Sequence, residues 1–275
     1  MSLFFGSIFS RIASSTAGIG ITATVISGGY RVHTFTGNTN ITFSESNYVD
    51  ILLVGGGGGC GGLPYPNPMS AGGGGAGATL QRKFIPVISG TPYPLVVGSG
   101  GLGGYFGPNG NPGGSTSFTY SGITTSAAGG GGGGGPQGGP GYSSPAASGG
   151  GSPGSNYSGG AGAGVFGVGF PGGQAGPQNY QASGGGGAGG AGSRGLPEGN
   201  GAGGPGVPIT YFTGNPADFV SRGGAGYPSP STPGNPNIAP INGYGSGGYF
   251  NGQANGNVNP GPGPGTPGVI YIKYL

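Results

Sequence analysis

The chain has 275 residues, of which 80 are glycine and 27 are proline, and its net charge is +3 with only 4% charged residues. An ordinary globular domain has about 25% charged residues. Glycine and proline cost about 1 and 3 kcal/mol per interior helical position relative to alanine, so this composition excludes a helical fold.

The scarcity of reactive side chains excludes further classes of protein. Cys60 is the only cysteine and His33 the only histidine, so neither a disulfide framework nor a zinc site of Cys and His ligands can form. The seven basic residues are dispersed, whereas a nucleic-acid-binding surface needs them clustered. We therefore expect no metal, no cofactor and no nucleic-acid partner.

Residues 1–29 are expected to form a docking or oligomerisation segment. Four apolar residues recur at helical spacing after Ser2, a possible N-cap, which predicts a short amphipathic helix. A signal peptide is a rival interpretation, but it needs positive charge before its apolar stretch, and Arg11 comes near the end of this one. A frayed tail is the third. No apolar run is long enough to span a membrane. The candidate docking residues are Phe5, Ile8, Phe9 and Ile12.

From residue 30 onward, segments rich in β-branched and aromatic residues alternate with glycine. Residues 48–54 are almost continuously apolar, which is typical of a strand covered on both faces. Such strands favour a folded chain over a disordered one, because apolar segments with high β-propensity would aggregate if they lay in a flexible linker. The predicted strands are 30–36, 41–44, 48–54, 78–88, 93–97, 115–120, 209–213 and 269–275.

The glycine runs between these strands are predicted to be structure rather than linker. Collagen is excluded, since the seven consecutive glycines at 129–135 ignore its three-residue period. Left-handed threefold helices of the polyproline-II type, here polyglycine-II helices, can instead pack side by side because they have no Cβ, and each N–H then bonds to a neighbouring helix. Ordering glycine is costly, so the packing must be collective. The runs are 55–59, 72–75, 129–135, 149–151, 159–164, 184–192, 201–206, 223–226 and 245–248.

The predicted fold class is therefore all-β plus polyglycine-II helices. Strands cap a sandwich of packed threefold glycine helices, with almost no α-helix, in a domain covering residues 30–275. If the helices run up and down, the irregular loops between them collect at the ends of the array, and a rigid scaffold that presents loops is typical of binding proteins.

Aromatic residues in these loops are the candidate receptor contacts. They lie among Asn, Gln, Ser and Gly, the surroundings of tyrosines in antibody loops. An alternative is that many of them close the ends of the glycine helices. The candidates are Tyr65, Tyr105, Phe106, Tyr142, Tyr157, Tyr180, Tyr227, Tyr244, Tyr249 and Phe250.

The order of elements resembles the glycine-rich domain of tail-fibre and virion-surface proteins of tailed bacteriophages. The resemblance rests on a strand that ends in a glycine run (49–59), a "VG-GG" element (95–101), a "GGSTSF" element (113–118), a second long run (125–135) and a final "GVIYIKY" strand (268–274). Receptor-binding adhesins at the fibre tips of T-even-like phages look similar in using packed glycine helices with variable loops. The resemblance covers about residues 30–275 and implies a virion attachment protein.

Motifs for catalysis are weak. Residues 162–167 match GxGxxG, but no strand, helix or downstream acid accompanies them, as nucleotide binding requires. His33 lies within a predicted strand without a nucleophile and acid beside it. The four acids Glu45, Asp50, Glu198 and Asp218 are far apart in sequence. We expect no enzymatic activity.

The sequence thus predicts a non-enzymatic virion protein that is assembled in the host cytoplasm and presents loops to a host-surface glycan or protein. Its N-terminal segment is expected to contact other virion proteins or sister copies in a homo-oligomer. The alternative is a self-assembling filament or decoration subunit that binds no receptor.

Overall fold

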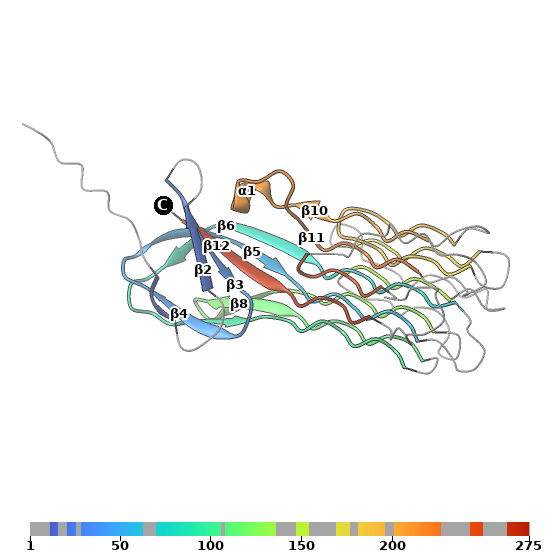
Figure 1. The fold of residues 1–275 in the computed structure, drawn as a ribbon. Coiled ribbons are helices and arrows are strands. Elements are labelled where there is room, and N and C mark those ends of the chain that lie inside the picture. Colours follow the sequence, from blue (N-terminus) through green and yellow to red (C-terminus); the bar gives the residue numbers. More distant parts are fainter. Residues whose placement is uncertain are drawn as a thin grey trace, which may run out of the picture.

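The fold was analysed in a computed structural model. It describes residues 12–15, 21–25, 29–62, 70–105, 108–135, 147–153, 169–176, 181–195, 201–226, 243–249 and 263–274. Figure 1 shows strands gathered at one end of this part of the chain and extended glycine segments lying side by side at the other.

The described residues are nearly all β-structure and extended chain, in several antiparallel sheets. One five-stranded sheet has the order β1-β4-β7-β8-β9, a second has the order β2-β3-β12-β5-β6, and β10 pairs with β11. Among the described residues the one helix, α1, has four residues. The elements are β1 (Ile12–Ser15), β2 (Ile21–Val25), β3 (Arg31–Phe35), β4 (Thr39–Phe43), β5 (Asn47–Val54), β6 (Thr79–Val87), β7 (Tyr93–Val96), β8 (Thr116–Tyr120), β9 (Ile123–Ala127), β10 (Val207–Pro208), α1 (Thr210–Thr213), β11 (Phe219–Val220) and β12 (Val269–Tyr274).

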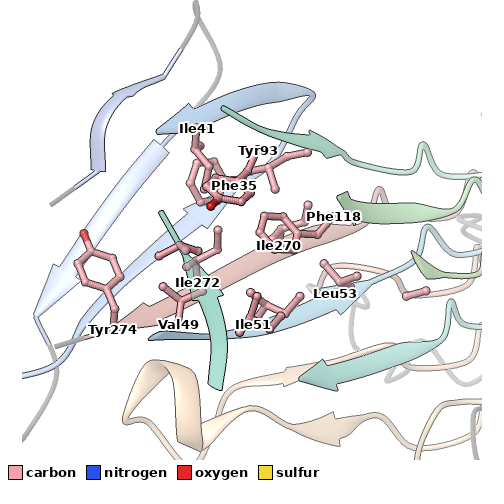
Figure 2. Packing of buried hydrophobic residues seen from close by; sticks show 14 of the residues in the cluster. Phe35, Ile41, Val49, Ile51, Leu53, Tyr93, Phe118, Ile270, Ile272 and Tyr274 are labelled. Atoms are coloured by element: carbon pink, nitrogen blue, oxygen red, sulfur yellow. The ribbon is translucent and has the colours of Figure 1, made fainter. Parts of the chain in front are cut away.

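A hydrophobic core lies between the two large sheets. Alternate residues of β5, Val49, Ile51 and Leu53, point into it from one sheet, and Ile41 and Phe118 contribute from the other (Figure 2). The opposite face of β5 is covered as well, because Leu52 and Val54 join a second cluster with residues of α1 and its flanks. This double burial explains the continuous apolar sequence of β5.

The glycine segments continue directly from the strands. β5 leads into residues 55–62, the central segment, and β12 is reached from residues 263–268. All residues of the central segment are buried. All of them are glycine except Cys60, which has the only side chain of the segment. The buried groups of this region are therefore almost entirely backbone.

The hydrogen bonds of the central segment change partner with a period of three residues. In each group of three successive residues, the first N–H donates to a carbonyl of residues 70–78, the second to one of residues 108–115, and the third to one of residues 263–268. The bonds run from Gly55, Gly58 and Gly61 to the carbonyls of Ala78, Gly75 and Gly72; from Gly56, Gly59 and Gly62 to those of Gly114, Asn111 and Pro108; and from Gly57 and Cys60 to those of Thr266 and Gly263.

The carbonyls of the central segment bond to three further segments, so it has six neighbours. They accept hydrogen bonds from residues 98–105, 128–135 and 243–249. Residues 70–78 and 181–190 are each surrounded by six described segments in the same way. Such an arrangement satisfies nearly every buried N–H and C=O without a conventional sheet, as buried backbone requires.

This close packing explains why the runs contain glycine. A Cβ on Gly58 would collide with the carbonyl of Gly131, and one on Gly74 with the carbonyl of Gly58. These obstacles are backbone atoms of other segments, which cannot rotate away as a side chain can. Even alanine would therefore not fit at Gly58 or Gly74 without moving a neighbouring segment.

Two local predictions are wrong. Residues 209–213 do not form a strand: residues 210–213 are the helix α1, and Ile209 precedes it. The helix ends at Gly214, which has a left-handed conformation (φ 74°) and donates its N–H to the carbonyl oxygen of Thr210. Phe212 of this helix is buried in the second cluster. Ile12 begins β1, which pairs with β4, instead of ending a helix. Phe5, Ile8 and Phe9 lie outside the described residues, and β2, also from the N-terminal segment, pairs with β3.

Replacement of Gly58 by alanine tests this packing. We expect Gly58→Ala to lower the free energy of unfolding by more than about 2 kcal/mol, because the methyl group can be accommodated only by separating two segments. Chemical denaturation measures the loss. The control is Gly190→Ala, whose methyl group would meet only the ring carbons of Pro205, at 3.1 Å, and should cost less than about 1 kcal/mol. Equal losses in the two variants would contradict the packing argument.

Candidate binding end of the glycine array

The end of the array remote from the sheets is formed by segments from many parts of the chain. Hydrogen bonds join Gly62 to Pro108, and Gly61 to Gly72. Elsewhere at this end, Gly176 donates to Gln181. These bonds tie the described segments together at their ends, so the ends are held in fixed positions relative to one another.

Tyr105 is the most exposed candidate contact among the described residues. It lies at the remote end of residues 98–105, and 66% of its surface is exposed. Ser99 and Leu102 are exposed on the same segment, whereas Gly98, Gly101 and Gly104 are buried. Exposure therefore repeats every three residues, because Gly101 and Gly104 donate to the central segment and the opposite row faces outward.

The other aromatic candidates divide into three groups. Tyr249, at the remote end, is half-buried. Tyr244 lies at the sheet end, where it is half-buried and packs against the second hydrophobic cluster. The rest, Tyr65, Phe106, Tyr142, Tyr157, Tyr180, Tyr227 and Phe250, lie outside the described residues.

Charged side chains gather at the sheet end. Asp50 of β5 accepts hydrogen bonds from the N–H of Phe84, at 2.8 Å, and from the hydroxyl of Tyr211. Lys273 of β12 donates to the carbonyl oxygen of Tyr211 at 2.9 Å, and its ammonium lies 3.8 Å from the centre of the Tyr211 ring. Lys83 covers the same ring at 4.3 Å.

This cluster attaches α1 to the sheet. Burial lowers the pKa of Lys273, although nearby Asp50 opposes that shift, and burial together with the bond to Asp50 raises the pKa of Tyr211 to about 12. The Asp50 carboxylate accepts two hydrogen bonds, which join it to β6 and to α1. The cluster could not be found from the sequence, because its members are far apart in the chain. Asp50 and Tyr211, for example, are separated by 161 residues.

Half-buried His33 and buried Cys60 have structural surroundings. His33 Nε2 lies 2.7 Å from the Tyr274 hydroxyl, and its ring stacks on that of Tyr274. Burial, with a smaller effect of Arg31, lowers the pKa of His33 to about 4. Burial also raises the pKa of the Cys60 thiol to about 12, which makes it a poor nucleophile.

The described residues were also compared with what a metal site and a membrane-spanning helix require. Within the described ranges, no three His, Cys, Asp or Glu side chains gather as a metal site would require. Within the same ranges, no helix is long and apolar enough to cross a membrane.

Comparison with protein families gives a match to the glycine-rich domain over residues 33–275. The chain belongs to the glycine-rich domain family. No curated protein matches it significantly. The match begins within β3 and extends through β12, so it includes all the described glycine segments.

The pKa of His33 predicts how the stability of this glycine-rich domain depends on pH. The folded protein keeps His33 neutral down to about pH 4, whereas the unfolded chain binds a proton near pH 6.5. The contribution of neutral His33 to the free energy of unfolding is therefore fully present above pH 6.5 and is lost as the pH falls from 6.5 towards 4. Thermal unfolding at pH 7.5, 5.5 and 4.5 measures the effect. His33→Phe should weaken the dependence, and an unchanged dependence in that variant would contradict the assignment.

Proposed function

We propose that this chain is a non-enzymatic attachment protein on the surface of a virion, and that the remote end of its glycine array contacts the host surface. The observation that carries the proposal is the architecture: hydrogen-bonded backbone fixes the positions from which loops emerge, and Tyr105 is exposed beside them. The resemblance of the order of elements to tail-fibre and virion-surface proteins also supports it, and the family match to a glycine-rich domain covers nearly the same residues.

We also infer that the array consists of polyglycine-II helices arranged as a sandwich on the strands. The three-residue period of the hydrogen bonds supports this inference, since a polyproline-II helix has three residues per turn. The six neighbours of the central segment are what hexagonal packing of such helices would give. A scaffold of this kind is stiff without needing large side chains.

The alternative function, a filament subunit, is less well supported because several outer segments of the array carry exposed proline. Pro264 and Pro267 occupy every third position of one segment, and Pro171 and Pro205 lie on two others. Proline offers no N–H to an incoming segment, just as it protects the edges of β-sheets. These edges are therefore poorly suited to lateral growth.

Amide hydrogen exchange tests the array. We expect the amides of residues 55–62 and 70–78 to exchange at rates limited by global unfolding, because all their neighbours are other segments of the array. The comparison is β9, an edge strand whose residues are mostly exposed. Exchange in the glycine segments as fast as in a free peptide, measured by mass spectrometry, would refute the proposed helices.

Cell binding tests the function. Protein labelled at an added N-terminal cysteine should bind cells of at least one strain in a bacterial panel, measured by flow cytometry. Tyr105→Ala should weaken this binding at least about tenfold, since exposed aromatic residues dominate binding energies when they contact a partner. The buried thiol of Cys60 should not take up the label.

The matched control is Tyr48→Ala. Tyr48 is similarly exposed (62%), but it lies on β5 at the sheet end. Its replacement should leave binding unchanged. Loss of binding in the Tyr48 variant alone would place the contact at the wrong end of the molecule. A protein that polymerises and binds no cell would favour the filament subunit instead.

A further inference from the structure

One outer edge of the array differs from the others. It is formed by residues 98–105, whose carbonyls accept hydrogen bonds from Asn111 and Gly114 of the next segment, residues 108–115, which has exposed Pro108 and Pro112. On residues 98–105 the exposed row has no proline and consists of Ser99, Leu102 and Tyr105. Leu102 and Tyr105 are each 66% exposed. We call this surface the tyrosine edge.

Backbone groups on the tyrosine edge are available to a ligand. Gly100 and Gly103 are half-exposed, and neither donates nor accepts a hydrogen bond within the described part of the chain. The exposed Asn111 side chain adds an amide donor and acceptor beside Leu102. The edge thus combines apolar area with neutral hydrogen-bonding groups.

Charge is absent from the tyrosine edge and sparse in the rest of the array. Residues 98–115 contain no Asp, Glu, Lys or Arg. Most of the charged residues that the structure describes belong to the sheets and their connections, such as Asp50, Lys83 and Lys273. An anionic ligand would find no counter-charge here and would lose water without compensation.

We propose that the tyrosine edge binds an uncharged glycan. The ring of Tyr105 offers an apolar face with a hydroxyl group, which suits a pyranose ring that has apolar C–H faces and polar edges. The groups of Gly100, Gly103 and Asn111 are placed to pair with sugar hydroxyls. This proposal rests on the proposed attachment function and names the class of its ligand.

The three-residue period gives the surface a repeat that suits a chain of sugars. In a threefold helix, Leu102 and Tyr105 stand on one line about 9 Å apart, because each residue rises about 3.1 Å. That distance exceeds one pyranose ring, so a ligand touching both side chains must be at least a disaccharide. Leu102→Ala should therefore weaken binding of the polymer, though less than Tyr105→Ala.

Treatment of the cells with periodate or with proteinase K shows whether the receptor is a glycan or a protein. Cells that bind the labelled protein are exposed to periodate, which cleaves the diols of sugars, or to proteinase K. We expect periodate to abolish binding and proteinase K to leave it intact. Binding should also be the same at 0.05 and 0.5 M NaCl, because salt screens charge contacts but not stacking or neutral hydrogen bonds. Tyr105→Phe, which keeps the ring, should retain binding to within about threefold.

Each opposite result would overturn the proposal. Loss of binding after proteinase K alone would indicate a protein receptor, and a fall of tenfold or more at high salt would indicate an anionic one. Binding unaffected by Tyr105→Ala, with the Tyr48→Ala control also intact, would place the glycan elsewhere. In these three cases the attachment function survives. If no cell in the panel binds the protein, the attachment function and the glycan proposal both fail.

Discussion

The structure depends on backbone hydrogen bonds between segments that have few Cβ atoms. In the central segment each N–H points to one of three neighbours in turn, and its carbonyls bond to three more. A single methyl group at Gly58 would meet the backbone of another segment. The constraint explains much of the composition: at most positions of a segment with six neighbours a Cβ would meet backbone, and the exceptions, such as Cys60 and Ala76, have small side chains.

Hydrogen bonds alone do not hold such an array together. Fixing one backbone residue costs about 1–2 kcal/mol, more for glycine, whereas a net hydrogen bond contributes about 1 kcal/mol. In a fully bonded interior there is one bond per residue, so the balance is close to zero or unfavourable. The core between the sheets supplies the missing stability. β5 and β12 connect it to the array, because both continue directly into glycine segments.

Much of the fold could be predicted from local sequence, because strands and glycine runs have distinct residue types. Val49–Val54 and the final strand have the apolar patterns of covered strands, and the structure places them side by side. The helix α1 could not be predicted, because Ile209 and Phe212 look like strand residues until Gly214 turns the chain. The packing of Tyr244 could not be predicted for a similar reason: its position depends on contacts with residues far away in sequence. The exposed row of Leu102 and Tyr105, by contrast, follows from a three-residue period visible between Gly98 and Gly104.

The same period limits where this domain can carry large side chains. A residue inside a glycine segment faces one of three directions, and on an outer segment the outward direction is the one that admits a large side chain without displacing a neighbour. Proline occupies that row on residues 263–267, while leucine and tyrosine occupy it on residues 98–105. Inward positions hold glycine or a small side chain, such as that of Thr266. A surface that presents large side chains to a ligand therefore has the outward rows of the outer segments as its place on the described array.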